Sequence, residues 1–109
     1  MSLLASAPLT LDPRTLQLGG AKGRIDVTDP ECRLLTALAS SPRGRLDTPQ
    51  LLAQAGKPDT ALGKRALEVQ LVRLRKKLEQ AGASPPTIKA VRGVGYQLCV
   101  AIALTSAPC

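Results

Sequence analysis

Histidine, phenylalanine and tryptophan are absent from this chain of 109 residues, and Tyr96 is its single aromatic residue. Without histidine the chain lacks the side chain that most often serves as a general base. No serine or cysteine lies in a Gly-x-Ser-x-Gly setting, and the carboxylates fall mostly in loops, helix starts and exposed helix faces. We therefore predict that the protein is not an enzyme and has no catalytic residues.

Cysteine is scarce and badly spaced for metal binding. Cys32, Cys99 and Cys109 form no CxxC pair, and without histidine a zinc site would need acidic ligands as well. We expect no metal and no cofactor. An odd number of cysteines without an export signal indicates a reducing cytoplasm, with Cys32 and Cys99 as small buried residues and Cys109 as a terminal thiol.

Long apolar runs are also missing. The run LCVAIAL has seven residues, whereas a membrane-spanning helix needs roughly 20. The N-terminal MSLLASAPLTLDP has neither the basic start nor the long apolar run of a signal peptide. The sequence predicts a cytoplasmic protein that does not enter a membrane.

Basic residues are concentrated in the second half of the chain. Residues 1–59 carry seven Lys and Arg against six Asp and Glu, whereas residues 60–109 carry eight against two. Such a surface suits nucleic acid or an anionic membrane surface, and the alternative is a basic face that serves solubility. A single aromatic residue disfavours base stacking, and so disfavours a reader of RNA or single strands.

The first half of the chain predicts strands followed by two helices. Residues 1–8 are expected to be a flexible leader, and the pieces LTLD, RTLQL and GRIDV to be three antiparallel strands. Thr28 and Glu31 then form a capping box for a helix that ends near Pro42. In DTPQLLAQAG, Thr48 is expected to cap a second helix, which Gly56 closes.

A third and longer helix is expected from about Thr60 to Ala81. At 100° per residue, its leucines at 67, 71, 74 and 78 fall within roughly 60° of one another and predict a buried stripe. The opposite face spans about 100° of arc. It gathers Arg65, Val69, Val72, Arg73 and Lys76. A face that only solubilises the protein has no physical need for the two valines.

The stretch TIKAVRGVGYQLCV predicts a β-hairpin around Gly93 and Gly95. A nucleotide-binding loop would need a third glycine and a following helix, but another strand follows here. Both glycines are expected to permit positive φ at the turn.

Two short helices, a long basic helix and a basic hairpin occur in the order of a winged helix. In that arrangement the long helix enters the major groove of DNA, and the hairpin tip reaches the minor groove or backbone. Arg73 then suits guanine, and Val69 and Val72 suit thymine methyl groups. The alternatives are a dimer contact for the valines, and for Tyr96 a ring packed against the third helix rather than a phosphate contact.

Three segments, IDVTDPECRLLTAL, LEVQLVRLRKKLE and IKAVRGVGYQL, together resemble the OmpR/PhoB family of winged-helix DNA-binding domains over about residues 9–98. The resemblance implies an α+β fold with a four-stranded N-terminal antiparallel sheet, three helices and a C-terminal hairpin wing. It also implies that the loop between Gly56 and Gly63 touches RNA polymerase, and that the chain forms a homodimer on DNA.

The function predicted from residues and resemblance together is sequence-specific binding of double-stranded DNA by a transcriptional regulator of the two-component type. The expected DNA-binding residues are Lys64, Arg65, Val69, Gln70, Val72, Arg73, Arg75, Lys76, Lys89, Arg92 and Tyr96. The DNA-binding domain is expected over residues 9–100, with residues 101–109 as an extension that lengthens the last strand, pairs with a second subunit or forms a tail. The alternative function is a winged helix that binds protein rather than specific DNA.

Overall fold

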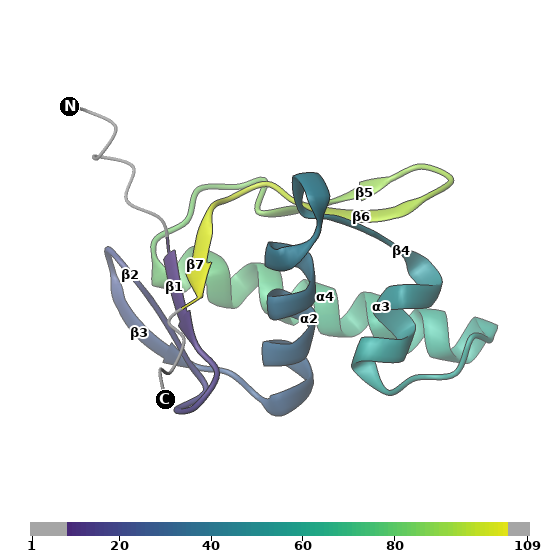
Figure 1. Ribbon diagram of the computed structural model, residues 1–109, viewed down its shortest axis with the longest axis horizontal. Coiled ribbons are helices and arrows are strands. Elements are labelled where there is room, and N and C mark those ends of the chain that lie inside the picture. Colours follow the sequence, from purple (N-terminus) through teal and green to yellow (C-terminus); the bar gives the residue numbers. More distant parts are fainter. Residues whose placement is uncertain (1–8, 105–109) are drawn as a thin grey trace.

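Two small β-sheets and three α-helices make up the computed structural model, which describes residues 9–104 (Figure 1). Their arrangement is a winged helix, which confirms the fold class predicted from the sequence. The expected leader over residues 1–8 and the terminal thiol of Cys109 lie outside the described residues.

The first sheet takes strands from both ends of the chain. β1 (Leu9–Asp12), β2 (Gln17–Gly20) and β3 (Gly23–Asp26) pair antiparallel, as predicted. The fourth strand is β7 (Ile102–Leu104), which pairs in parallel with β1 and completes the order β3-β2-β1-β7. The sheet has four strands, as the resemblance implied, but the fourth comes from the C-terminal end of the described chain and is parallel to β1.

The apolar segment that follows the wing, residues 99–104, explains this difference. The N–H of Leu9 donates to the Ala101 carbonyl at 3.0 Å, and Ile102 is half-buried against the core. Because the chain returns along the open edge of β1, the segment hydrogen-bonds the backbone groups of β1 that would otherwise lack a partner. It also covers apolar surface of the core with Ile102. Residues 102–104 thus form a separate strand rather than an extension of the last strand of the wing.

Helix α2 (Asp29–Ser40) begins where the sequence predicts. The Thr28 hydroxyl accepts from the Glu31 N–H at 3.3 Å, and the Glu31 carboxylate accepts from the Thr28 N–H at 2.8 Å. This is the predicted capping box. A short 3-10 turn, η1 (Pro42–Gly44), follows the helix.

Helix α3 (Thr48–Ala55) has a different cap from the predicted one. Asp47 is the N-cap, since its carboxylate accepts from the Gln50 N–H at 2.9 Å, and Thr48 is already the first helical residue. Asp47 rather than Thr48 is the N-cap because its backbone is extended, as the last residue of a short strand that was not predicted from the sequence. Gly56 closes the helix with φ +71°, as predicted.

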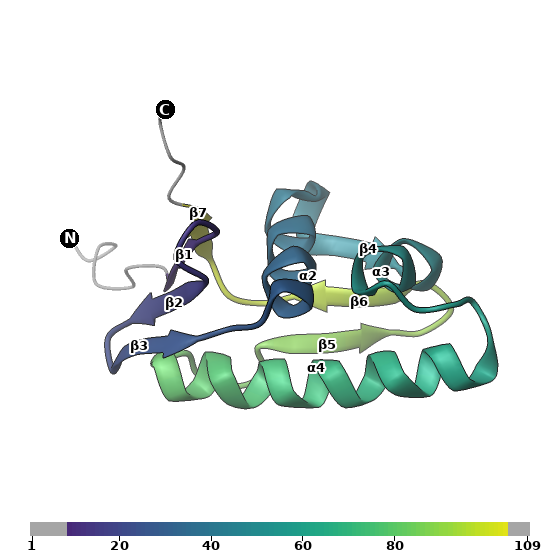
Figure 2. The same cartoon turned by 90° about the horizontal axis from the view of Figure 1, so that it is seen from below.

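Helix α4 (Ala61–Ala81) is capped by Thr60, whose hydroxyl accepts from the Gly63 N–H at 3.1 Å. It runs along one long side of the molecule beside β5 and β6 (Figure 2). Leu67, Leu71, Leu74 and Leu78 are all at most 1% exposed, which confirms the predicted stripe. The position of this stripe fixes which face of α4 is turned to solvent.

The wing is a three-stranded sheet with the order β4-β6-β5. The predicted hairpin is present as β5 (Ile88–Val91) and β6 (Gly95–Leu98), and β4 (Arg45–Asp47) pairs antiparallel with β6. β4 was not predicted from the sequence, because its three residues are too few to show a period.

A largely leucine core joins the helices and both sheets. Cys32 lies in it, as predicted, but the expectation for Cys99 is wrong. Its N–H still donates to the Thr87 carbonyl at 2.7 Å, and its thiol is exposed because successive residues alternate faces and the preceding Leu98 is buried. Within residues 9–104, no helix is long and apolar enough to cross a membrane.

Candidate nucleic-acid interface

The solvent-facing side of α4 carries the side chains that the helical period placed there. We call it the α4 surface, and it consists of Arg65, Val69, Val72, Arg73 and Lys76, all of them exposed. Val69 and Val72 are each 47% exposed, so nearly half of each apolar side chain faces water. The burial of the opposite stripe prevents α4 from rotating to hide them.

Two further predicted residues lie at the margins of this surface. Lys64 is exposed near the start of α4, with its Nζ 3.9 Å from Asp59. Both side chains are more than half exposed, so this contact contributes little. Gln70 is half-buried, and its Oε1 is buried without a hydrogen-bond partner among the described residues. The acceptor of Gln70 therefore points into the protein rather than toward the α4 surface.

Arg75 links α4 to the wing. Its Nε donates to the Ile88 carbonyl at 2.8 Å, and the side chain is half-buried. A charged donor in such a bond is stronger than a neutral one. Part of the guanidinium is thus committed to holding β5 beside α4.

Tyr96 packs its half-buried ring against the core on the side of the wing that faces α4. Burial raises the pKa of its hydroxyl, and the nearby Glu68 carboxylate raises this pKa further while Arg75 opposes the change. These influences place Tyr96 among residues of α4. The ring of Tyr96 is therefore packed, as the alternative held. The contact of its hydroxyl with phosphate stays a prediction.

The wing tip is a tight turn. The Val94 N–H donates to the Val91 carbonyl at 2.9 Å, Gly93 lies between them with φ +76°, and Arg92 is exposed beside it. The Val94 carbonyl accepts from the Thr48 N–H at 3.1 Å, which fixes the tip to the start of α3. The tip and the N-terminal half of α4 lie toward the same end of the molecule (Figures 1 and 2).

Gly95 has a different role from the predicted one. It is a strand residue without positive φ, and a Cβ there would lie 2.2 Å from the Leu46 carbonyl oxygen. Gly95 is needed because β4 approaches closely, whereas Gly93 alone supplies the positive φ at the turn.

Lys89 is separated from the α4 surface by the strand register. It lies opposite Gln97 in the β5–β6 ladder, and Gln97 in turn lies opposite Arg45 of β4. Side chains on directly paired residues share one face of a sheet, and successive residues alternate faces. Lys89 therefore lies on the outer face of the wing, whereas Ala90 and Tyr96 lie on the face toward α4.

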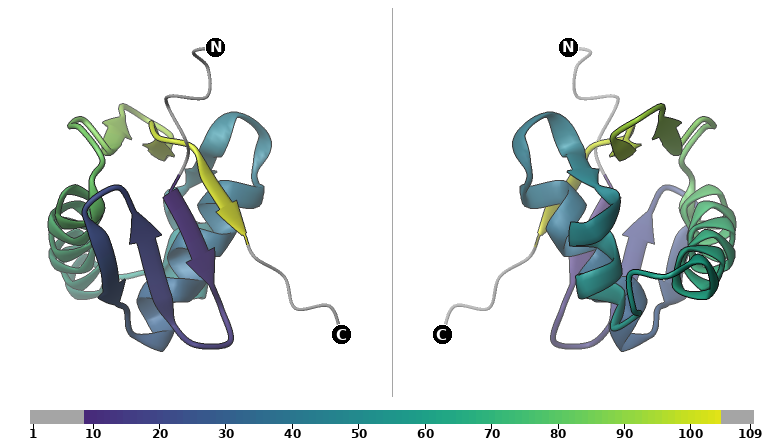
Figure 3. Two further views of the ribbon diagram at one scale, coloured as in Figure 1. Left: turned by 90° about the vertical axis from the view of Figure 1, so that its left-hand side faces the viewer. Right: turned by 90° about the vertical axis from the view of Figure 1, so that its right-hand side faces the viewer.

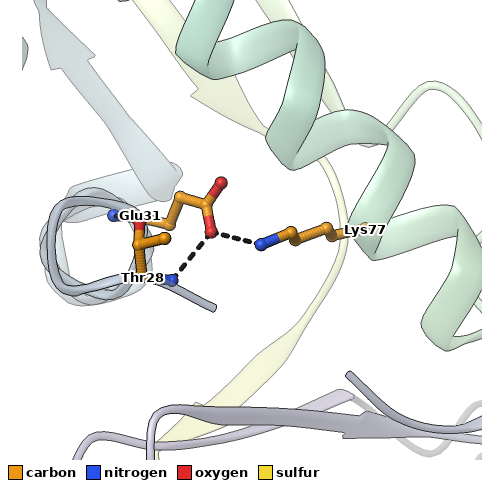
Figure 4. Close-up of polar contacts among 3 residues, drawn as sticks. All are labelled: Thr28, Glu31 and Lys77. Carbon is orange, nitrogen blue, oxygen red and sulfur yellow. Dashed lines mark hydrogen bonds and ion pairs between the residues drawn. The ribbon is translucent and has the colours of Figure 1, made fainter. Parts of the chain in front are cut away.

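An ion pair that sequence reasoning missed fixes α4 against α2. Lys77 donates from Nζ to Oε1 of Glu31 at 2.6 Å, and the same oxygen accepts from the Thr28 N–H (Figure 4). Burial acts to raise the Glu31 pKa, but the hydrogen bonds from Lys77 and Thr28 and the Lys77 charge outweigh it, so this pKa is lowered. In the sequence, only the capping box pointed to this ion pair. It predicts the position of Glu31 at the start of α2, but it does not predict that Lys77 binds it.

Glu68 is a second residue that the sequence analysis did not select. It is exposed on α4 next to Val69, and its charge acts on Tyr96. It is an acidic group at the edge of a cationic surface. No group of three or more His, Cys, Asp or Glu within residues 9–104 is placed to hold a metal ion.

Comparison with known proteins relates the chain to bacterial regulators. Residues 22–98 match the family described as transcriptional regulatory protein, C terminal. The chain is 39% identical over 88 residues to the regulatory protein VirG of Agrobacterium tumefaciens (strain 15955) and 40% identical over 90 residues to the response regulator MprA of Mycobacterium tuberculosis (strain ATCC 25618 / H37Rv). These matches cover 81% and 83% of this chain but 33% and 39% of the two relatives, so it spans well under half of their length.

Solved structures agree in fold. The DNA-binding domain of the response regulator AdeR, in complex with an intercistronic region, has a TM-score of 0.69 at 25% identity, covering 84% of this chain and 93% of that one. The C-terminal domain of the nisin resistance regulator NsrR has a TM-score of 0.65 at 29% identity, covering 84% and 91%. The DNA-binding domain of CadC from E. coli has a TM-score of 0.66 at 22% identity, covering 81% and 82%, and supports the fold alone.

Proposed function

Because this chain belongs to the OmpR/PhoB-type family of transcriptional regulatory domains, we propose that it binds double-stranded DNA sequence-specifically and regulates transcription. The observation that carries the proposal is the α4 surface, which is cationic and yet keeps two valines 47% exposed. A helix of this kind fits the major groove, where phosphates attract the cations and base edges meet the apolar groups.

Within the α4 surface each residue type has a distinct partner on DNA. Arg73 offers two parallel donors to guanine O6 and N7, and Val69 and Val72 pack against thymine methyl groups. Arg65 and Lys76 contact phosphates at the two ends of this surface, and Lys64 does so next to Arg65. Gln70 contributes through its amide nitrogen, because its oxygen is buried.

The wing supplies a second contact. We propose that Arg92 enters the minor groove, where a narrow groove concentrates negative potential. Arg75 holds β5 against α4 and meets the DNA backbone with its remaining donors. Tyr96 braces the wing and adds its hydroxyl to the same backbone, whereas Lys89 reaches phosphate only from the outer face of the wing.

Fluorescence titration of duplexes selected from a random pool, repeated at several salt concentrations, tests the proposal. Arg73→Ala should weaken the selected site by roughly 1–3 kcal/mol and relax its sequence preference. Lys76→Ala should weaken all duplexes alike and lower the salt slope by about 1.

The charge-matched control is Arg33→Ala, since Arg33 is exposed on α2 and outside the α4 surface. Its duplex affinity should stay close to that of the wild type. Absence of salt-dependent binding to any duplex would contradict the proposal. A stable oligomer that hides Val69 and Val72 and ignores DNA would instead favour the alternative, a protein-binding winged helix.

We propose further that the chain acts by binding and not by catalysis, in the cytoplasm, where bacterial DNA is accessible. Residues 9–104 form the DNA-binding unit of the proposal, and two copies bind one operator. The loop over residues 56–63 is the proposed contact with RNA polymerase. In its support, Leu62 at the start of α4 is 77% exposed.

The polymerase contact has its own test. Leu62→Ser should lower transcription in a reconstituted assay by several-fold and leave duplex affinity unchanged. Equal loss of DNA binding and transcription would show that Leu62 serves the DNA contact or the fold instead.

A further inference from the structure

A cleft of about 580 Å³ lies on the outer side of the wing, away from the α4 surface. It is bounded by the end of α2, the η1 turn, the start of β5 and the segment that joins β6 to β7. Its lining consists of Ala39, Arg43, Gly44, Lys89 and residues 97–102. None of the proposed DNA contacts on α4 reaches it.

The cleft is positively charged on two sides. Arg43 and Lys89 line it, and no acidic residue is among the described residues that do so. Gln97 fixes this arrangement, because its Nε2 donates to the Arg43 carbonyl at 3.2 Å and its Oε1 accepts from Arg45 at 3.3 Å. The cations are therefore presented by a tethered loop and a strand rather than by mobile segments.

An open strand edge forms another side of the cleft. Leu9 donates to the Ala101 carbonyl, so the backbone groups of Ala101 and Ala103 face β1 and those of Ile102 face the other way. Among residues 9–104, β7 is the last strand in its sheet, and Ile102 lines the cleft. Within that range nothing pairs with the outward N–H and C=O of Ile102, which are available to a further strand.

This combination distinguishes between anionic partners. The DNA backbone carries only acceptors, so it can satisfy Arg43 and Lys89 but not an exposed carbonyl. An extended polypeptide carries both donors and acceptors, and acidic side chains on one face of it would meet the two cations. The half-buried side chains of Val100 and Ile102 would cover residues on its other face.

The cleft and the α4 surface can be occupied together. Seen along the long axis, α4 lies beside β3, at the far side of the first sheet from β7 (Figure 3). A partner bound at β7 would therefore leave the recognition helix uncovered.

We propose that this cleft is a docking site for an extended acidic segment of a partner protein, which adds a strand to the open edge of β7. The segment pairs with Ile102 through its backbone and with Arg43 and Lys89 through its carboxylates. This surface would let a second protein join the regulator while α4 is bound to DNA, with Lys89 then paired with the partner rather than with phosphate.

Fluorescence anisotropy with a labelled eight-residue peptide that alternates Glu with Val tests the proposal on the full chain without DNA. The peptide should saturate the protein and perturb the amide resonance of Ile102. A peptide of the same composition with its four glutamates in one block should bind at least tenfold more weakly. Arg43→Glu/Lys89→Glu should weaken the alternating peptide at least tenfold.

The charge-matched control is Arg14→Glu/Arg33→Glu, which changes two exposed cations elsewhere and should alter peptide affinity less than twofold. Ile102→Pro, checked for folding by circular dichroism, should also abolish binding because it removes the free N–H. Equal affinity for both peptides, or resonance changes confined to α4, would overturn the proposal. So would loss of duplex affinity in Arg43→Glu alone, which would assign this arginine to DNA.

Discussion

At the scale of single residues, the two glycines of the wing show how similar sequence signals arise from different constraints. Gly93 has φ +76° and open space around the position of a Cβ, so its requirement is conformational. Gly95 has an ordinary backbone, but Leu46 and Asp47 of β4 occupy the space that a side chain would need. Only the first constraint belongs to the turn itself.

Alanine at each position separates these constraints. Gly95→Ala should lower the free energy of unfolding by about 2–3 kcal/mol, because the neighbours are backbone atoms that cannot move aside. Gly93→Ala should cost only about 1 kcal/mol. Gly93→Asn should cost less again, since asparagine tolerates positive φ. Urea denaturation measures all three, and equal losses for the two alanine variants would contradict this account.

At the scale of elements, the orientation of α4 depends on contacts at three sides. The leucine stripe buries one face, Lys77 binds Glu31 at the start of α2, and Arg75 binds the Ile88 carbonyl at the base of β5. Two cations of the basic run RLRKK are thus engaged within the protein. Arg73 and Lys76 keep their side chains exposed, which leaves them for DNA under the proposed function.

The Glu31–Lys77 pair predicts a pH-dependent stability. Lys77→Met should cost about 2 kcal/mol at neutral pH, because it leaves a buried carboxylate short of a charged donor. The folded pKa of Glu31 lies below its ordinary value of 4.5, so the pair contributes fully above that value and loses its contribution as pH falls through the folded pKa. The stability difference between wild type and variant should therefore shrink as the pH falls below 4.5.

Urea denaturation at neutral and acidic pH measures this effect. The control is Lys77→Met made in a Glu31→Gln background, which retains an acceptor for the Thr28 N–H. There the cost of Lys77→Met should not change with pH in this range. A difference between wild type and Lys77→Met that is constant with pH would show that the alkyl chain of Lys77, not its charge, matters.

At the scale of the whole molecule, β7 joins the last described residues to the first. Its parallel pairing with β1 covers the open edge of that strand and places Ile102 against the core. The sheet formed by the first three strands is therefore completed by residues that follow the wing in the sequence.

Truncation tests this contribution. A chain that ends at Val100 should be about 2 kcal/mol less stable than one that ends at Leu104, since it loses backbone pairing and a half-buried isoleucine. Under folding conditions the two should bind the selected duplex within about twofold of each other, since β7 lies away from α4. A large loss of DNA affinity would show that β7 orients the recognition helix.

Local patterns in the sequence were sufficient for the helices. The leucines of α4 and the Thr28–Glu31 box depend on residues three to seven apart, and the structure confirms both. The exposed face of α4 follows directly from the buried one. This is why five of the candidate DNA-binding residues could be placed on one surface before the fold was known.

Features that depend on distant pairing could not be predicted in the same way. β4 pairs with β6 across the whole of α3 and α4, and Lys77 finds Glu31 from 46 residues away. The face occupied by Lys89 depends on the register of two strands, because a shift of one residue reverses it. Nor does any local pattern show that Cys99 follows the last residue of β6 and stays exposed.

The parallel pairing of β1 with β7 has a mechanical consequence. The chain enters the sheet at Leu9 and leaves it at Leu104, on two adjacent strands that run the same way. Tension applied to the two ends would pull these strands past each other along their axes, so their hydrogen bonds would be loaded in shear and would have to break together rather than one by one. Within the described chain, the strand pair that the load reaches first is thus arranged as a clamp.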